Sequence, residues 1–401
     1  MIKIGIECEN LEDPKSRWGI GKITLNLLQE FAKNPEWHKK YKLYLYFKSR
    51  VPDDDMFQSA DWRTKFIIRI MGFPSFNIFY HILMPLRAMM DRVDWMFFPA
   101  YQLPPLYFGK SVVVLTEDAY YEYKYGSLPF RYKLSYRIFT NWAAKFATKI
   151  LAISETSKKE VVRVYKISPD KIFVNYLGID FTKPTTYNLQ PTTYSYLLFV
   201  GQMFPRRHAK ETILAFEKLL RQSSGQVITE HSNILENVGM SELKLIMVGP
   251  DKYSEPTINQ LVAQVNKRLG REAIIHRDYV EDGELAELYA GAKALIYVSD
   301  REAFGLPPME ALSFGVPPII ADNELGHELF GARPEKTGSL FGDYAFYSKS
   351  GGIDDIKDAI QEVLINTEKT ENIKNRGPEF IKKYNWKSFT DRFFEIIKND
   401  Y

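Results

Sequence analysis

The sequence contains a single cysteine, Cys8, among its 401 residues. One cysteine excludes an internal disulfide framework and a four-cysteine zinc site, and it fits a reducing compartment such as the cytoplasm. The chain also has little excess of positive over negative charge, because 53 basic residues against 50 acidic ones leave a formal net charge of only +3. So small an imbalance argues against a dedicated nucleic-acid-binding protein.

Long apolar runs are absent as well. The first ten residues, MIKIGIECEN, alternate like a strand and lack the apolar stretch that a secretory signal needs. The most apolar region, residues 76–90, is interrupted by polar and charged side chains and by Pro85. A membrane span needs about 20 mostly apolar residues. We therefore predict that residues 76–90 form buried helix and loop, and that the protein is cytoplasmic.

Short apolar runs alternate with helical segments along the whole chain. A length of 401 residues predicts two domains, at roughly 100–200 residues for each. We predict strands at 3–8, 42–47, 94–98, 111–116, 149–154, 172–177, 196–201, 244–249, 273–280, 294–299, 317–321 and 345–348. Strands that alternate with helices are typical of parallel sheets with crossover helices. The predicted fold is therefore α/β, with two doubly wound, Rossmann-like domains.

A segment rich in threonine and proline separates the two halves. We predict a first domain over residues 1–181, a linker over 182–193 and a second domain over 194–380. Near the end of the chain, apolar residues within 387–398 have the spacing of an amphipathic helix. Two such domains facing each other would form a cleft at the carboxyl ends of their strands, where open α/β sheets bind ligands.

The most informative motif follows the predicted strand 294–299, at residues 300–310 (DREAFGLPPME). Gly305 permits a tight turn, and the two prolines after it suit the first turn of a new helix. Backbone amides at such a helix start, near Phe304, Gly305 and Leu306, could bind an anion.

Two carboxylates, Glu302 and Glu310, belong to the same motif. Glu310 could accept two hydrogen bonds from hydroxyl groups, as a ribose offers them. Glu302 could hold sugar hydroxyls or support positive charge at an anomeric carbon. The residue types alone leave open the alternative that both are solvated carboxylates around a helix cap.

The long run from Tyr279 to Pro318 resembles the signature of the family-4 retaining glycosyltransferases, or glycosyl transferases group 1, with Glu302 and Glu310 at the family's E-x₇-E pattern. The resemblance is closest to bacterial mannosyltransferase-like members. It implies the GT-B fold, in which two Rossmann-like domains face each other across a cleft and the second holds most of the nucleotide sugar. It also implies that residues 381–401 include a helix that returns to the first domain.

Two arginines, Arg206 and Arg207, lie in a segment (199–208) that resembles the family's glycine-containing loop with an Arg-Lys pair. Paired guanidinium groups suit a diphosphate, because each can form a forked pair of hydrogen bonds. Gln202 occupies a position at which some members carry a further arginine, so one phosphate contact is missing or replaced.

Near the N-terminus, residues 18–28 resemble the family's glycine loop and first helix. The resemblance implies that Gly19 and Gly21 let the backbone approach the donor phosphate and the acceptor. The same residues fail as a dehydrogenase fingerprint, because Thr24 stands where the third glycine would be.

Residues 112–118 resemble a strand that often ends in His-Asp in the family, but here Glu117 stands at the histidine position and Asp118 is retained. The resemblance places both residues near the anomeric centre. Glu117 could accept hydroxyl hydrogen bonds and stabilise an oxocarbenium-like state, although it cannot act as a neutral imidazole. The alternative is that Glu117 caps the following helix.

Residues 121–160 hold eight basic residues against three acidic ones, with aromatic residues between them. Such a segment could lie on an anionic membrane surface as a peripheral contact. The alternative is an ordinary helix with an internal aromatic stripe and solvated lysines. No nucleic-acid recognition module accompanies the charge, so we expect no nucleic-acid partner.

These features together predict a retaining hexosyltransferase that moves a sugar from a nucleotide-sugar donor to a saccharide or lipid-linked acceptor in surface polysaccharide or lipopolysaccharide synthesis. GDP-mannose is favoured as the donor, with a UDP-sugar as the alternative. We expect no metal and no cofactor besides the donor; the six histidines lack metal-ligand spacing. The alternatives are a non-catalytic nucleotide-sugar-binding partner and another GT-B enzyme, such as a sugar-nucleotide epimerase or a phosphorylase.

Overall fold

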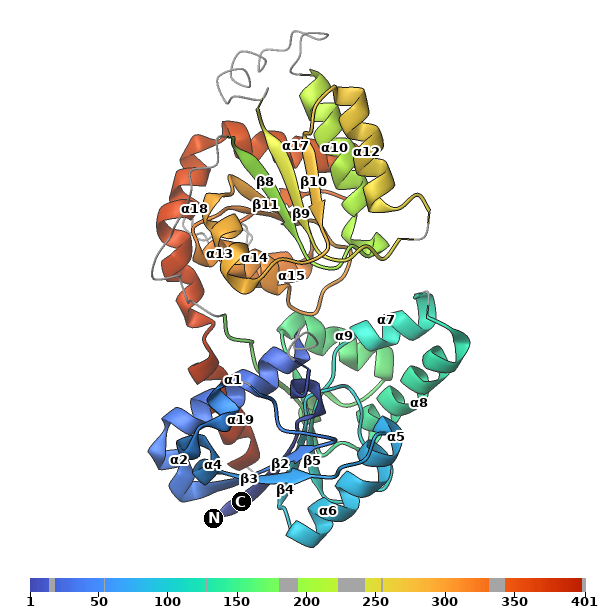
Figure 1. Cartoon of the computed structure of the whole chain (residues 1–401), viewed down its shortest axis with the longest axis vertical. Coiled ribbons are helices and arrows are strands. Elements are labelled where there is room, and N and C mark those ends of the chain that lie inside the picture. The colour runs from blue at the N-terminus through green and yellow to red at the C-terminus, as the bar shows by residue number, and fades with distance from the viewer. Residues whose placement is uncertain are drawn as a thin grey trace. The chain divides into compact units, whose positions relative to one another are not determined.

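The structure, a computed structural model, describes residues 1–13, 19–53, 55–126, 128–179, 194–222, 242–253, 255–331 and 343–398. It divides into two compact units, the first comprising Met1–Gly178 with Tyr384–Tyr401 and the second Ile179–Lys383 (Figure 1). The predicted linker, 182–193, lies outside the described residues.

The first unit is built on a seven-stranded parallel sheet with the order β3-β2-β1-β4-β5-β6-β7. Its strands are β1 (Ile2–Glu7), β2 (Tyr41–Phe47), β3 (Phe66–Ile70), β4 (Trp95–Phe98), β5 (Lys110–Val114), β6 (Lys149–Ala152) and β7 (Ile172–Val174). The chain builds outward from β1 to β3 and then crosses to the other side of β1, so the strand order reverses between β1 and β4. Such a reversal is where open α/β sheets bind ligands.

Helices cover both faces of this sheet. They are α1 (Ile20–Lys33), α2 (Pro35–Lys40), α3 (Asp55–Gln58), α4 (Ala60–Lys65), α5 (Phe76–Ile78), α6 (Met84–Asp91), α7 (Asp118–Tyr125), α8 (Phe130–Phe146), α9 (Glu155–Tyr165) and α19 (Trp386–Lys398). A π-helical turn, Phe79–Leu83, joins α5 to α6 just before Pro85. The helix α19 contacts α1, and its Phe393 packs edge-on against Phe97 of β4 at 4.8 Å between ring centroids. The last helix of the chain is therefore part of the first unit.

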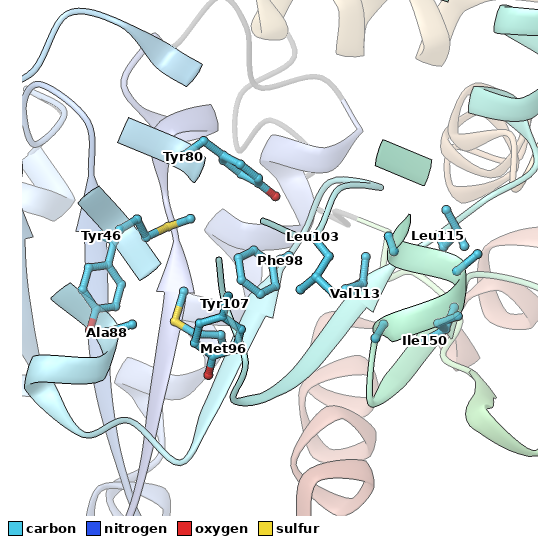
Figure 2. Packing of buried hydrophobic residues seen from close by; sticks show 14 of the residues in the cluster. Tyr46, Tyr80, Ala88, Met96, Phe98, Leu103, Tyr107, Val113, Leu115 and Ile150 are labelled. Carbon is cyan, nitrogen blue, oxygen red and sulfur yellow. The ribbon is translucent and has the colours of Figure 1, made fainter. Parts of the chain in front are cut away.

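One face of the first sheet forms a continuous apolar core with α5–α6 and α8 (Figure 2). The strands contribute side chains such as Met96, Phe98 and Val113, and the helices add Tyr80 and Ala143. These side chains are almost completely buried. Removal of so much apolar surface from water is the main stabilising contribution to a sheet packed in this way.

The region 76–90 is buried on one face only, whereas the sequence predicted a buried segment. Phe79, Tyr80, Met84 and Ala88 face the core, but the opposite face of the same helical segment is exposed, including Met90 at 73%. The expectation of a buried segment therefore holds for one face only, because the sequence is apolar on both faces and its composition does not distinguish them.

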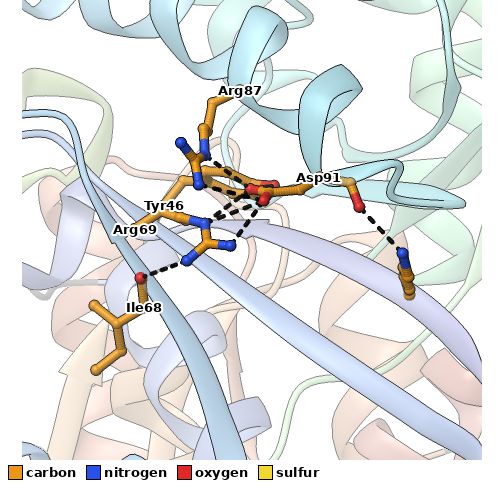
Figure 3. Close-up of polar contacts among 6 residues, drawn as sticks. Tyr46, Ile68, Arg69, Arg87 and Asp91 are labelled. Atoms are coloured by element: carbon orange, nitrogen blue, oxygen red, sulfur yellow. Dashed lines mark hydrogen bonds and ion pairs between the residues drawn. The ribbon is translucent and has the colours of Figure 1, made fainter.

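A polar cluster at the end of α6 attaches this helix to the sheet (Figure 3). The Asp91 carboxylate accepts hydrogen bonds from Arg69 of β3 (Nη2, 2.8 Å), from Arg87 (Nε, 3.2 Å) and from the Tyr46 hydroxyl (3.1 Å). Burial alone would raise the pKa of Asp91, but the two guanidinium groups hold it below its usual value. A paired, ionised carboxylate of this kind fixes the register of a helix against its sheet.

The second unit has a six-stranded parallel sheet with the order β10-β9-β8-β11-β12-β13. Its strands are β8 (Tyr196–Val200), β9 (Lys244–Val248), β10 (Ile274–Arg277), β11 (Ala294–Tyr297), β12 (Pro318–Ala321) and β13 (Phe346–Ser348). Its helices are α10 (Ala209–Arg221), α12 (Ile258–Leu269), α13 (Asp282–Gly291), α14 (Leu306–Ser313), α15 (Glu324–Phe330), α17 (Ile353–Ile365) and α18 (Thr367–Phe380).

Two parallel sheets flanked by helices confirm the predicted α/β class with two Rossmann-like domains. In the second sheet the strand order reverses between β8 and β11. Among the described residues, no helix combines the length and the apolar character needed to cross a bilayer.

Candidate active site

Two loops of the second unit meet at the reversal of its strand order. One follows β8 and runs from Gly201 to His208, and the other follows β11 and runs from Val298 to Gly305. Both leave from the carboxyl ends of adjacent strands, where a doubly wound sheet places its ligands. The sequence motifs with Arg206–Arg207 and Glu302 therefore occupy the expected ligand-binding edge.

The two loops are joined by an ion pair between Arg207 and Glu302. Arg207 Nε lies 2.7 Å from Glu302 Oε1 and Nη2 lies 3.2 Å from Oε2, so the contact is bidentate. Each side chain is only 14% exposed. Ser299 Oγ donates a further hydrogen bond to Glu302 at 3.1 Å. Burial would raise the pKa of Glu302, but the Arg207 charge and hydrogen bonds keep it below the usual value, so the carboxylate is ionised at neutral pH.

Arg206 is the more exposed cation of the pair. Its guanidinium lies over the Phe204 ring at 4.7 Å, donates from Nε to the Arg301 carbonyl at 3.3 Å, and comes no closer than 3.9 Å to Glu302. Its side chain is 32% exposed. Arg206 can therefore reach a ligand at the surface, whereas Arg207 is held within the site by Glu302.

His208 is a contributor to this site that the sequence did not reveal. Its backbone is left-handed, with φ of 50°, a conformation that is uncommon for residues other than glycine. The imidazole Nε2 lies 2.7 Å from Asp300 Oδ1, and the Asp300 amide donates to the Arg206 carbonyl at 2.9 Å. These bonds hold the arginine-bearing loop against the loop that carries Glu302.

The turn into α14 has the geometry that the motif predicted. Gly305 is left-handed, with φ of 82°, and precedes the first helical residue, Leu306. Pro307 and Pro308 have no amide hydrogen, so Gly305 and Leu306 are the residues that can offer backbone donors at this helix start. Phe304 is buried and supports the turn. A cavity beside Glu302 and Gly305 continues toward α15.

Glu310 lies one turn into α14, on the same helix. Its Oε2 accepts a hydrogen bond of 3.0 Å from the hydroxyl of Tyr289 in α13. Tyr289 is almost completely buried, and burial together with the neighbouring Glu310 raises its pKa well above the usual value. The tyrosine therefore stays a hydrogen-bond donor that orients Glu310, a role that no local sequence signal indicated.

Glu117 and Asp118 lie in the first unit, where Glu117 precedes α7. Glu117 is buried and accepts a 2.5 Å hydrogen bond from Ser157 Oγ of α9. Its side chain makes no cap bond to α7, so the structure does not support the capping alternative. Burial, reinforced by the Asp118 charge, raises the pKa of Glu117 to about 8, so the group is largely protonated at neutral pH.

Gly19 and Gly21 are found at the start of α1 in the first unit. Gly19 precedes the helix with φ of 52°, a left-handed conformation, while Gly21 is buried within the first turn.

Glu7 is a candidate site residue that the sequence reasoning missed. It is a buried carboxyl at the end of β1 that accepts a hydrogen bond from the Glu9 amide at 2.7 Å. Burial raises the pKa of Glu7 to about 8. A carboxylate at the carboxyl end of a buried strand is the signal that could have found it.

Residues 186–380 match the glycosyl transferases group 1 family. Among curated proteins, the chain is 26% identical to O-antigen chain mannosyltransferase B of Escherichia coli, over 63% of this chain and 61% of that protein. It is 24% identical to O-antigen chain mannosyltransferase RfbU of Salmonella typhimurium, over 49% of this chain and 48% of that protein. The chain thus spans about half to three fifths of the length of these relatives.

Solved structures match the whole chain. Anabaena HepE in complex with UDP-glucose superposes with a TM-score of 0.66 at 15% identity, covering all of both chains. WaaG, a glycosyltransferase involved in lipopolysaccharide biosynthesis, has a TM-score of 0.65 at 13% identity, covering 99% of this chain and 100% of that chain. At such identities the likeness establishes the fold alone. Through residues 186–380 the chain is thus similar to the glycosyl transferases group 1 family, it has mannosyltransferases among its relatives, and its fold is that of the GT-B glycosyltransferases.

Proposed function

We propose that the protein is a retaining, metal-independent hexosyltransferase that uses a nucleotide sugar as its donor. GDP-mannose is the favoured donor and a UDP-sugar the alternative, and the acceptor is a saccharide or a lipid-linked saccharide of surface glycan synthesis. The observation that carries this proposal is the Arg207–Glu302 pair beside the left-handed Gly305, at the strand reversal of the second sheet. The similarity to O-antigen mannosyltransferases supports the choice of substrates.

The donor diphosphate would bind Arg206, Arg207 and the amides of Phe304, Gly305 and Leu306. Two cations and a helix start concentrate positive potential where negative charge develops as the sugar leaves. Glu302 would accept a hydrogen bond from the donor sugar while it holds Arg207 in place. Glu310, oriented by Tyr289, would accept hydrogen bonds from the ribose.

In the mechanism we propose, the acceptor hydroxyl attacks from the face that the diphosphate leaves, which gives retention in a single step. The bond between the anomeric carbon and the phosphate oxygen breaks, and a bond to the acceptor oxygen forms on the same face. The acceptor proton passes to the departing phosphate oxygen, so no protein base is needed. The Asp118 carboxylate would stabilise positive charge at the anomeric carbon, whereas Glu117, which is largely protonated at neutral pH, would form a hydrogen bond with a sugar hydroxyl. Gly19 and Gly21 would give the phosphate and the acceptor access to the backbone. Exclusion of water protects the donor, because water is a competing acceptor.

The proposal also includes a cytoplasmic location with a peripheral contact to an anionic membrane through residues 121–160. What supports it is the excess of basic over acidic residues in that segment.

The test is release of nucleotide from a panel of GDP- and UDP-sugars, with and without saccharide and lipid-linked acceptors. Acceptor-dependent release from one donor is the expected result. Binding of a donor without release would favour the non-catalytic binding partner, and conversion of the donor sugar without an acceptor would favour an epimerase.

Site variants connect that activity to the geometry. Glu310→Ala should weaken donor binding in titration calorimetry, and Arg207→Ala should slow transfer. Lys374→Ala is a matched control, because it removes an exposed cation of the same unit from α18. Unchanged donor affinity in Glu310→Ala would remove the ribose assignment, and unchanged turnover in Arg207→Ala would remove the diphosphate assignment.

A further inference from the structure

Tyr297 is the last residue of β11 and lies between the core of the second unit and the loops of the candidate site. Its side chain is only 5% exposed, and it belongs to the core cluster that also contains Tyr196 and Tyr289. The same residue lines the cavity beside Glu302 and Gly305. Tyr297 therefore connects the packed sheet with the loops at its carboxyl edge.

The ring of Tyr297 supports the guanidinium of Arg207. The central carbon of this guanidinium lies 5.2 Å from the centroid of the Tyr297 ring. The Phe204 ring is farther from Arg207, at 6.0 Å, and closer to Arg206, at 4.7 Å. A cation over an aromatic face is attracted by the quadrupole of the ring, and the attraction is stronger where water is excluded. Arg207 is the more buried of the two arginines, so its contact with Tyr297 is the stronger candidate for a fixed position.

Both glycine turns of the site lie against this ring. A Cβ atom placed on Gly201 would be 3.6 Å from the Tyr297 ring and 3.0 Å from Nη1 of Arg207. A Cβ atom placed on Gly305 would be 3.8 Å from the same ring. The two loops thus approach Tyr297 at positions that carry no side chain. The ring is therefore a shared support for the arginine-bearing loop and for the turn into α14.

The ion pair acts on Tyr297 with both of its charges. Burial raises the pKa of Tyr297 above its usual value, the Arg207 charge opposes this rise, and the Glu302 charge adds to it. The tyrosine consequently keeps its proton at neutral pH, and its ring stays uncharged. The ring contacts the face of the guanidinium, whereas Glu302 and the Gln202 carbonyl, at 3.1 Å from Nη1, accept hydrogen bonds from its edge. Arg207 is thereby held from two directions.

We infer that Tyr297 is a positioning residue for the donor diphosphate, and that it acts through Arg207. A guanidinium that is already fixed at its face and its edge loses little freedom when a phosphate binds, so more of the contact energy appears as affinity. The inference rests on the proposed function for the identity of the ligand. The contact between the ring and the guanidinium, however, exists without any ligand and can be measured without one.

Two substitutions at Tyr297 separate the ring from the hydroxyl. The assay is titration calorimetry of the full chain with GDP and with UDP. Tyr297→Leu removes the ring and should weaken binding of the preferred nucleotide about tenfold, whereas Tyr297→Phe keeps the ring and should stay within about twofold of the parent affinity. Tyr297→Met, which is also without a ring, gives the same test if the leucine variant does not fold. Full affinity without the ring, or an equal loss in Tyr297→Phe, would overturn the inference.

Tyr196→Leu is the matched control. Tyr196 is the first residue of β8, belongs to the same core cluster and is 2% exposed. Its replacement should lower the midpoint of urea unfolding, as Tyr297→Leu does, and leave nucleotide affinity at the parent value. An affinity loss in the control as large as that in Tyr297→Leu would assign the effect to general loss of core packing and would contradict a positioning role.

A comparison without ligand separates this inference from the proposed function. Urea unfolding is measured for Tyr297→Leu, for Arg207→Ala and for the double variant. If the ring holds the guanidinium, the loss of unfolding free energy in the double variant should be smaller than the sum of the two single losses. Additive losses would overturn the inference. Non-additive losses in a protein that binds neither GDP nor UDP would refute the proposed diphosphate ligand and still support Tyr297 as the residue that positions Arg207.

Discussion

Replacement of Arg207 by alanine should destabilise the second unit by about 3 kcal/mol at neutral pH. Removing one partner of a buried ion pair costs about 3–5 kcal/mol, because the other charge is left uncompensated. The lower end of that range applies here, since both side chains keep 14% of their surface exposed and Ser299 still donates to Glu302. In a unit of this size, roughly 2–4 °C per kcal/mol gives a fall in unfolding temperature of about 6–12 °C.

The loss of unfolding free energy in Arg207→Ala, relative to the parent protein, should shrink as the pH falls. In the parent protein the pKa of Glu302 is lowered, so its contribution to stability is present above the usual carboxyl range and is lost as pH falls through the lowered value. In Arg207→Ala the burial of Glu302 is no longer opposed by Arg207, so its pKa should rise above the usual value. Protonation then relieves the uncompensated charge in the variant at a pH at which the parent still keeps its ion pair.

Scanning calorimetry of the full chain at pH 7.5 and pH 5 measures this difference. Arg206→Ala is the control, because it removes the neighbouring cation, whose guanidinium is no nearer than 3.9 Å to Glu302. Arg207→Met with Glu302→Met removes both charges and should recover most of the lost stability, but not donor binding. A deficit in Arg207→Ala that is absent at pH 7.5, or of the same size at both pH values, would refute the reasoning.

Three further variants test individual contacts. Lys149→Met should destabilise the first unit by about 1–2 kcal/mol in urea unfolding, because the buried amine donates to the Ile396 carbonyl near the end of α19 at 2.5 Å. A carboxyl whose pKa is raised to about 8 stabilises the fold at low pH and loses that contribution as pH rises through 8. Glu117→Gln should therefore reduce the fall in first-unit stability between pH 5 and pH 8, as measured by thermal unfolding. Tyr289→Phe should lower donor affinity about fivefold in calorimetry, because Glu310 loses the hydroxyl that orients it.

Each of these variants has a matched control. Lys171→Met removes a more exposed lysine that donates to a carbonyl at the end of α8. Glu155→Gln neutralises an exposed carboxylate of α9 in place of a buried one. Tyr196→Phe removes another tyrosine hydroxyl of the second unit, which donates to the Leu288 carbonyl instead of a carboxylate. An equal effect in a control and its partner would contradict the specific contact.

The sequence located strands well wherever burial is complete. All twelve predicted strands are present. Most are central strands, which are apolar on both faces and form an unbroken run, while β7, β10 and β13 are edge strands. The strand β3 was missed: it is an edge strand in which Phe66 is buried and the other residues are partly or fully exposed. The predicted strand 149–154 ran too far, because Ser154 is already the cap of α9 and accepts from the Ser157 amide.

The site was predictable only as far as local motifs extend. The glycine turn and the E-x₇-E spacing are local, and the structure places both in the segment that follows β11, at the strand reversal of the second sheet. The Arg207–Glu302 pair joins residues 95 positions apart, and the support of Glu310 by Tyr289 comes from another helix. Such contacts depend on how strands are ordered in the sheet, which residue types do not encode. The roles given to the individual site residues in binding and transfer stay predictions.

The division into two units has a spectroscopic consequence. All six tryptophans of the sequence, at positions 18, 37, 62, 95, 142 and 386, fall within the first unit, and the second has none. Indole emission is therefore an intrinsic probe of the first unit alone. Under the proposed function, a change in that emission when GDP-mannose is added would report an effect of the donor on the first unit, without any label having been attached.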